Sequence, residues 1–566
     1  MKKNIYVLGI SCFFHDSSVA LIKNWEIIFA IEEEKLSRIK HDSSFPEKSI
    51  NKCLEYCKLD INDINYIWFY EKPFIKFENF IKNYIEVWPF WYYWFIKWIK
   101  EWLKYKLWFS SILKDKTWYK WNIIYLDHHL THASWSFFSS KYNKAAILTI
   151  DWVWEESTTT WWIWDWINIE IKEKIIFPNS IGLIYSTFTS YLWFDVNDWE
   201  YKVMWLAPYG EPIYTNIILD ELLNINDDWS YELDMKYFSF HLWKKMFNSN
   251  FESLFNHRFR KKTENIEKFH KDIASSIQKV IEILLLKISN YIYSKTKLDT
   301  LCISWWVWLN CVANYEILKK SKFKNIYVQP SPWDGGSSIW ICYYIYHNIL
   351  GNKRSINFNN IYLWEEYSDN NIENKLKRYS DKVTFIKLSE SNLIKKVSTL
   401  ILDNNIIWWF QWRTEFWPRA LGNRSILWNP LHKENWKKIN LNIKYRESFR
   451  PFAPSITEDS LSKYYDLEWS FPYMLFIAKV RDKNLFPAVT HLDGSSRIQT
   501  VNKDQNKKYF LLLKEFEKKT GFPILINTSF NLAWKPIVNS PEDALNTFLH
   551  CDMDYLVLWD YLVNKL

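Results

Sequence analysis

Glycine is scarce in this 566-residue chain. It has nine glycines, whereas the average usage of about 7% would give roughly 40. Tryptophan is in excess by a similar amount, with 37 residues. Trp25 follows Asn24 between two strand-like segments, where glycine would complete an Asn-Gly hairpin turn. We hypothesise that most of these tryptophans are UGA codons that specify glycine but are read as tryptophan. The alternative is a chain that is truly rich in tryptophan.

Other scarcities exclude several classes of protein. The seven cysteines are odd in number and have no paired spacing, so we expect reduced thiols in a cytoplasmic protein rather than a disulfide framework. The 72 basic and 64 acidic residues are interspersed, and without a basic stripe no nucleic-acid partner is expected. The aromatic stretch Val87–Ile96 is too short to span a bilayer, which takes about 20 apolar residues. The N-terminal apolar run ends at His15 without a cleavage site, which predicts a buried strand rather than a signal peptide.

Strand-like and helix-like segments alternate along the chain, which predicts an α/β fold. Residues 272–296 have helical periodicity, and a polar, turn-rich stretch follows residue 350. We therefore predict a domain over residues 1–352, a linker over 353–366 and a second domain over 367–566.

The first half contains a set of candidate metal ligands. His128 and His132 are four residues apart, so they share one face of a helix, and that spacing suits a transition metal. Asp151 ends a strand-like segment, and Asp334 enters a glycine loop. The alternative is that the histidines are structural and that Asp151 only starts a turn.

Tryptophans also stand in segments that resemble glycine loops. The segment SWWVWLNC contains Trp305 and Trp306, and read as glycine these residues would let backbone N–H groups cradle an anion. Asn310 follows the loop and can bind a nucleotide or acyl group. His15 lies at a strand end, where it can accept a hydroxyl proton near neutral pH, although a polar turn histidine would look the same.

Cations cluster in the second half, beside Glu415 and among Phe and Pro residues. Arginine forks suit phosphate oxygens, although a solvated charged face is the simpler interpretation. These cations are Arg413, Arg419, Arg424, Lys444, Arg446 and Arg450, with Arg497 further on. Short polar side chains then follow a strand-like segment and can bind a nucleotide: Asn527, Ser529 and Asn531.

The segments ISCFFHDSSVALI, HHLTHAS, TIDWVWE, EYKVMWLAPYGEP and SWWVWLNC, with glycine restored, resemble the nodulation-type and antibiotic-biosynthesis O-carbamoyltransferases. IIWWFQWRTEFWPRALGNRSILWNP is similar in the same way, and there only Trp409 matches a tryptophan of the family. The resemblance implies an N-terminal actin-like ATPase (ASKHA) domain, shared with tRNA threonylcarbamoyl transferases, and a C-terminal α+β YrdC-like domain.

The resemblance also implies roles for individual residues. His128, His132, Asp151 and Asp334 would bind divalent iron or a similar metal, which would hold a carbamoyl-adenylate. His15, Asp151 and Asn310 would be catalytic, and Lys40, Trp305 and Trp306 would lie at the nucleotide. The second-half cations would bind carbamoyl phosphate and ATP, with magnesium, and a small hydroxylated acceptor would receive the carbamoyl group.

Three alternatives stay open: a threonylcarbamoyl-type tRNA-modifying enzyme, a non-catalytic module that binds ATP or a partner, and a pseudoenzyme if the tryptophans are real. The acceptor and the oligomeric state, a homodimer included, are not fixed by the sequence.

Overall fold

The computed structural model describes residues 4–86, 99, 106–121, 123–154, 156–196, 199–242, 245–304, 309–331, 334–354, 358, 361–435, 440, 444, 446–551 and 553–566. The chain forms two compact units. Unit 1 comprises Met1–Ile28 and Ser43–Asn357, and unit 2 comprises Phe29–Asp42 and Phe358–Leu566. The segment Phe29–Asp42, which the sequence placed within the first domain, therefore belongs to the second unit.

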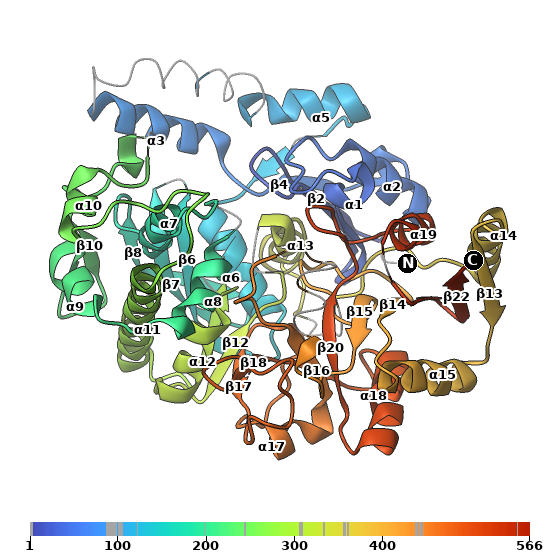
Figure 1. The fold of residues 1–566 in the computed structure, drawn as a ribbon. Helices are drawn as coiled ribbons and strands as arrows, with labels where there is room; N and C mark the ends of the chain where they lie inside the picture. Colours follow the sequence, from blue (N-terminus) through green and yellow to red (C-terminus); the bar gives the residue numbers. More distant parts are fainter. Residues whose placement is uncertain are drawn as a thin grey trace. The chain divides into compact units, whose positions relative to one another are not determined.

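Unit 1 is built on two five-stranded sheets whose strands follow the same order, and several of these strands are labelled in Figure 1. The boundary with unit 2 falls after Ile28, within the edge strand β3 of the first sheet. The first has the order β3-β2-β1-β4-β5 and the second the order β8-β7-β6-β11-β12. In each sheet the second and third strands in that order pair antiparallel, and the last two join in parallel. The strands are β1 (Tyr6–Ser11), β2 (Ser18–Lys23), β3 (Glu26–Glu32), β4 (Tyr66–Phe69), β5 (Ile123–Tyr125), β6 (Lys144–Trp154), β7 (Ser157–Asp165), β8 (Asn168–Ile176), β11 (Thr300–Ser304) and β12 (Asn325–Val328).

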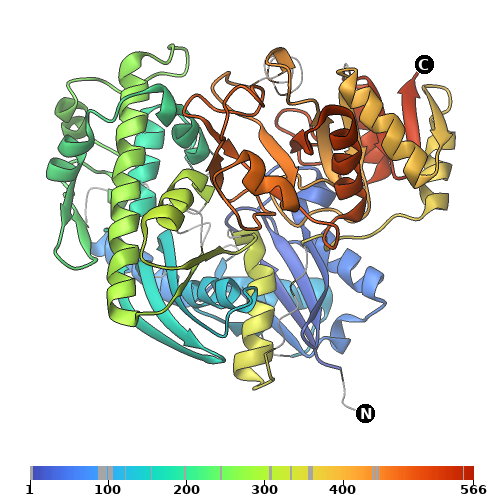
Figure 2. The same ribbon diagram turned by 90° about the horizontal axis from the view of Figure 1, so that it is seen from below.

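Helices of unit 1 pack closely on these sheets. Helix α13 (Asp334–Tyr344) lies against β1, where a Cβ on Gly9 would stand 1.9 Å from the carbonyl oxygen of Ser338. The hydroxyl of Ser18 on β2 donates to the carbonyl of Gly335 at 2.5 Å. Helix α11 (Lys268–Thr296) begins and ends close to its predicted bounds and is the long helix of Figure 2. The prediction of an α/β fold is confirmed.

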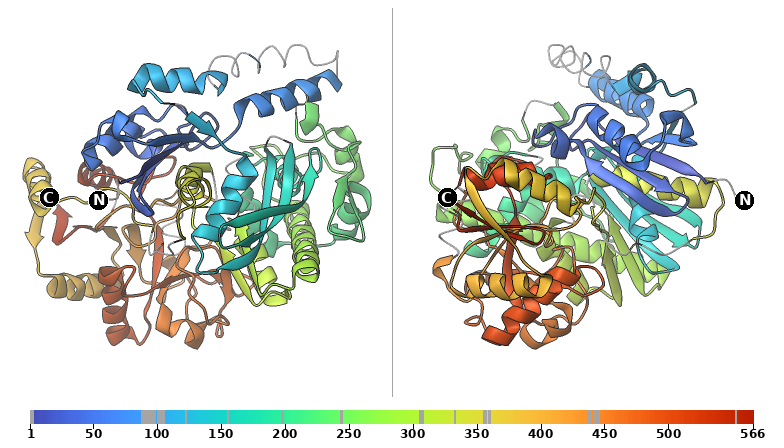
Figure 3. Two further views of the ribbon diagram at one scale, coloured as in Figure 1. Left: turned by 180° about the vertical axis from the view of Figure 1, so that it is seen from behind. Right: turned by 90° about the vertical axis from the view of Figure 1, so that its right-hand side faces the viewer.

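Unit 2 is built on a mixed eight-stranded sheet of order β13-β22-β21-β14-β15-β20-β16-β19. Helices α15 (Glu390–Leu402) and α18 (Lys507–Thr520) bury their apolar faces against it (Figure 3). Trp409 lies in that core cluster. The strands are β13 (Val383–Lys387), β14 (Ile407–Phe410), β15 (Arg424–Trp428), β16 (Ala453–Thr457), β19 (Gln499–Val501), β20 (Ile524–Ser529), β21 (Tyr555–Leu558) and β22 (Tyr561–Lys565).

The apolar start of the chain forms the buried strand β1, as predicted. The aromatic stretch Val87–Ile96 lies outside the described residues. Among the helices that are described, none combines the length and apolar character needed to cross a membrane.

Candidate active site

Two histidines of α6 (His128–Phe138) lie near a carboxylate of β6 in unit 1. The helix begins at His128 because the side chain of Asp127 accepts a backbone N–H of the first turn at 3.1 Å. The Nε2 atoms of His128 and His132 are 3.2 Å apart, and Nε2 of His128 is 3.8 Å from Oδ2 of Asp151. The structure thus brings together three of the four predicted ligands. Asp334 begins α13, but its side chain lies outside the described residues.

The opposite ring nitrogens orient the two imidazoles. Nδ1 of His128 is 3.3 Å from the carbonyl oxygen of Tyr70, and Nδ1 of His132 is 3.1 Å from the hydroxyl of Ser304. Burial lowers the pKa of both histidines well below the ordinary value, so both are neutral near pH 7, the form that binds metals. Two imidazole nitrogens and a carboxylate are donors that fit a divalent transition metal. Their role as ligands stays a prediction.

His15 follows β1, and its ring is oriented by its neighbours. Its Nδ1 atom is 3.0 Å from Oδ2 of the buried Asp16, and its ring centre is 4.7 Å from that of Phe14. A carboxylate on one imidazole nitrogen fixes the ring and raises the basicity of the other nitrogen. This geometry suits the predicted role of His15 as a proton acceptor.

Asn310 serves first as a helix cap. Its side-chain oxygen accepts the N–H of Ala313 at 3.1 Å, which starts α12 (Cys311–Lys320), and its amide donates to Gln278 at 2.8 Å. A contact between Asn310 and an adenylate stays a prediction. Trp305 and Trp306 lie outside the described residues.

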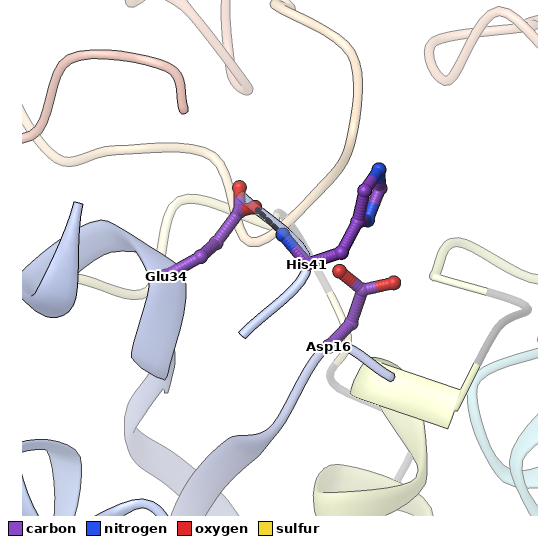
Figure 4. Close-up of side chains that lie close together, drawn as sticks. All are labelled: Asp16, Glu34 and His41. Atoms are coloured by element: carbon purple, nitrogen blue, oxygen red, sulfur yellow. Dashed lines mark hydrogen bonds between the residues drawn. The ribbon is translucent and has the colours of Figure 1, made fainter. Parts of the chain in front are cut away.

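Lys40 belongs to the segment Phe29–Asp42 of unit 2. Its side chain is exposed, with Nζ 2.8 Å from Nε2 of His41. Figure 4 shows the backbone N–H of His41 donating to the carboxylate of Glu34, at 3.0 Å. The sequence predicted a nucleotide contact for Lys40, which stays a prediction.

The buried Lys444 contacts two other predicted residues of unit 2, Ser529 and Asn531. Nζ of Lys444 donates to the carbonyl of Ser529 at 2.6 Å and to the side-chain oxygen of Asn531 at 2.9 Å. Burial, and next the charges of Arg446 and Arg450, hold the pKa of Lys444 well below its ordinary value. The acceptors around this ammonium are neutral, so an anion would be its best partner.

The arginine-rich loop between β14 and β15 is organised by Glu415. One carboxylate oxygen accepts the backbone N–H groups of Leu421, Asn423 and Arg424, at 2.9, 2.8 and 3.1 Å. Between them Gly422 has φ of 106°, a conformation that favours glycine. Glu415 is 3% exposed, so this carboxylate fixes the shape of the loop from inside.

Arg424 is more deeply buried than expected for a residue predicted to bind phosphate. Its guanidinium is fully buried, stacks on Phe410 at 3.5 Å, and donates to the carbonyls of Gln411 and Trp412. Burial lowers the pKa of Arg424 to about 10, so it remains charged at neutral pH. These contacts support the loop, whereas binding of phosphate by Arg424 stays a prediction.

The other predicted arginines are spread over unit 2. Arg446 donates to the side chain of Asn440 at 2.6 Å, and Arg450 pairs with Glu447 at 3.5 Å. Arg413 and Arg419 are half-buried in the loop after β14, and Arg497 ends the strand β18 (Ser495–Arg497). Arg446 and Arg450 are therefore held by side-chain partners, whereas Arg413 and Arg419 belong to the loop that Glu415 organises.

Asn527 joins a polar network that the sequence did not reveal. Its amide donates to the carbonyl of Ala420 at 3.1 Å and to Gln499 at 2.8 Å, and Gln499 donates to the carbonyl of Leu421 at 2.8 Å. Tyr362, which the sequence placed in the linker, also donates to Leu421, at 2.9 Å.

A small pocket adjoins this network, lined by Ile361, Tyr362, Leu421, Pro472, Tyr473, Gln499, Thr500, Val501, Gln505 and Asn506. The one signal in the sequence for this network was that Gln499 lies two residues after the predicted site residue Arg497.

Comparison with known proteins defines the class. Residues 6–341 match the family described as carbamoyltransferase N-terminus, and residues 398–565 match carbamoyltransferase C-terminus. The chain therefore belongs to the carbamoyltransferase family and is a carbamoyltransferase enzyme, as the resemblance predicted.

Three relatives show how far the similarity extends. The Synechocystis protein sll1178 is 39% identical, with 99% of this chain and 97% of the relative covered. The nodulation protein NolNO of Sinorhizobium fredii is 32% identical, with 98% and 79% covered. The 3'-hydroxymethylcephem-O-carbamoyltransferase of Amycolatopsis lactamdurans is 30% identical over 43% of this chain and 44% of its own.

Proposed function

We propose that this enzyme makes carbamoyl-adenylate from carbamoyl phosphate and ATP, and then transfers the carbamoyl group to a hydroxyl of a small acceptor. The observation that carries the proposal is the convergence of His128, His132 and Asp151 in unit 1. The duplicated sheet order of unit 1 supports the actin-like assignment. The name of the Amycolatopsis relative supports transfer to oxygen.

Activation is assigned to unit 2. Water would hydrolyse carbamoyl phosphate to carbamate and phosphate, and a carbamate oxygen would then attack the α-phosphorus of ATP and release pyrophosphate. Lys444 and the arginines around Arg419 and Arg450 would hold the anionic oxygens, and arginine binds such oxygens bidentately. The YrdC-like identity of this unit belongs to the same proposal.

Transfer is assigned to unit 1. His15, oriented by Asp16 at 3.0 Å, would accept the proton of the acceptor hydroxyl as the oxygen attacks the carbamoyl carbon and AMP leaves. His128, His132 and Asp151, with Asp334, would hold a divalent metal, iron among the candidates. That metal would supply Lewis-acid polarisation of the carbamoyl oxygen.

The test separates the two steps. Without an acceptor, the enzyme should convert ATP to pyrophosphate and carbamoyl-adenylate only when carbamoyl phosphate is present. Adding a hydroxylated acceptor should release AMP and form a carbamate ester. Pyrophosphate release that does not depend on carbamoyl phosphate would contradict the proposal. Lys444→Met should reduce the pyrophosphate release that depends on carbamoyl phosphate, and Lys518→Met, at an exposed site of α18, serves as its control.

A further inference from the structure

Six tryptophans of the described residues have a left-handed backbone. This conformation is uncommon for any residue except glycine, and for a bulky side chain it is an outlier. Tryptophan supplies six of the 17 non-glycine residues with positive φ, and asparagine, which tolerates the conformation, supplies three. The six are Trp118 (60°), Trp166 (57°), Trp193 (57°), Trp412 (36°), Trp534 (65°) and Trp559 (56°).

Two of them close helices. Trp118 caps α5 (Phe109–Thr117), and its N–H donates to the carbonyl of Lys114 at 2.8 Å. Trp193 follows α7 (Ile181–Tyr191), and its N–H donates to the carbonyl of Ser190 at 2.9 Å. A left-handed residue at this point is usually glycine. Trp118 is 80% exposed, so packing of the indole does not offset the strain.

Two more lie in two-residue hairpin loops. Asp165 pairs with Asn168, which leaves Trp166 and Ile167 as the loop between β7 and β8. Leu558 pairs with Tyr561, which leaves Trp559 and Asp560 between β21 and β22. The favoured two-residue turns need positive φ at one or both positions, and glycine, asparagine and aspartate supply it.

A fifth occupies the third position of a tight turn. The N–H of Lys535 donates to the carbonyl of Leu532 at 3.3 Å, so Trp534 is the third residue of that turn. A turn with positive φ at its third position is of type II and requires glycine or asparagine there. The indole of Trp534 is 68% exposed. The sixth, Trp412, lies two residues after the end of β14, at the start of the arginine-rich loop.

Trp409 is the contrasting case. It lies in the extended strand β14, is fully buried in the core cluster of unit 2, and its indole N–H donates to the carbonyl of Gly422 at 2.9 Å. The buried indole N–H of its neighbour Trp408 has no hydrogen-bond partner among the described residues. A buried tryptophan normally finds an acceptor. Two adjacent tryptophans thus differ in whether their surroundings accommodate an indole.

We infer that the six left-handed positions are glycine in the protein that the cell makes, and that Trp409 is tryptophan. Glycine is the favoured residue at the helix ends, in the hairpins and in the turn, and these positions are independent of one another. At Trp412 a glycine would also remove an indole from the start of the loop that carries Arg413 and Arg419. The inference does not depend on the proposed reaction.

The direct test is a peptide map, by mass spectrometry, of the protein purified from its own cells. We expect glycine at all six positions, encoded by UGA, and tryptophan at 409, encoded by UGG. Tryptophan in the peptides, or UGG codons at the six positions, would overturn the inference. This readout does not involve activity, so failure of the proposed reaction would not affect it.

A second measurement uses recombinant protein. We expect the chain with glycine at the six positions to melt at a higher temperature than the chain with tryptophan, whereas Trp409→Gly in the same background should lower the melting temperature. If the six-residue variant does not fold, Trp118→Gly alone tests the most exposed site. A lower melting temperature for Trp118→Gly than for its parent would count against the inference.

Discussion

Replacement of Glu415 should weaken unit 2 about as much as the truncation of a large buried apolar side chain. Glu415→Ala removes the acceptor of three buried backbone N–H groups, those of Leu421, Asn423 and Arg424. An unsatisfied buried donor costs about 1–3 kcal/mol. Because the loop can relax around water, we expect a loss of roughly 3–5 kcal/mol rather than the full sum. Glu415→Gln keeps an acceptor oxygen but loses the charge, so a loss of about 1–3 kcal/mol is expected.

The assay combines thermal unfolding with hydrogen exchange. In a domain of this size, one kcal/mol lowers the melting temperature by roughly 2–4 °C, so Glu415→Ala should melt well below its parent. The amides of Leu421, Asn423 and Arg424 should exchange faster in both variants, because local opening needs less free energy. Glu468→Gln, at an exposed carboxylate of unit 2, is the control.

The reasoning is refuted if Glu415→Ala unfolds within about 1 kcal/mol of its parent, or if the three amides keep their protection. Either result would mean that the loop holds its shape without the carboxylate. We also expect the carbamoyl-phosphate-dependent step to weaken before unfolding sets in, since this loop carries Arg413 and Arg419.

Three further predictions address the sites. His132→Ala should release the bound metal, detected by elemental analysis, and abolish transfer while carbamoyl-adenylate still forms; loss of both steps would contradict a two-site enzyme. Arg419→Ala or Arg450→Ala should do the reverse and reduce pyrophosphate release first; unchanged adenylation would remove these arginines from the activation site. Lys444 has a lowered pKa in the folded state, so between that pKa and the unfolded value of about 10.4 the unfolded chain binds more protons and the free energy of unfolding rises with pH. Lys444→Met should remove that rise in urea titrations, and an unchanged slope would show that Lys444 does not contribute to it.

Local patterns predicted part of the site well. The four-residue spacing of His128 and His132 placed both imidazoles on one helix face, and the strand before Asp151 brought its carboxylate near them. The predicted bounds of the long helix also hold within a few residues, since helical periodicity is a local property.

Long-range contacts were not predictable in the same way. The position of Glu415 in the sequence does not reveal that the chain turns back at Gly422 and points three N–H groups at one oxygen. Nor does the arginine-rich pattern distinguish Arg424, whose guanidinium binds backbone carbonyls, from arginines nearer the surface. Such assignments depend on tertiary folding rather than on spacing.

The segment Phe29–Asp42 has a consequence for any attempt to separate the enzyme into halves. Its residue Arg38 donates to the carbonyls of Ile537 and Pro536 at 2.8 and 3.1 Å, and Phe29 packs edge-on against Trp364. A fragment starting at residue 358 would lack these partners and expose the surface they cover. Unit 2 therefore includes residues that are translated more than three hundred positions before the rest of that unit. During synthesis Phe29–Asp42 is made long before its partners in unit 2, so unit 2 cannot complete its fold until the C-terminal part of the chain is made. We therefore expect that the two units have to be expressed and refolded as one polypeptide.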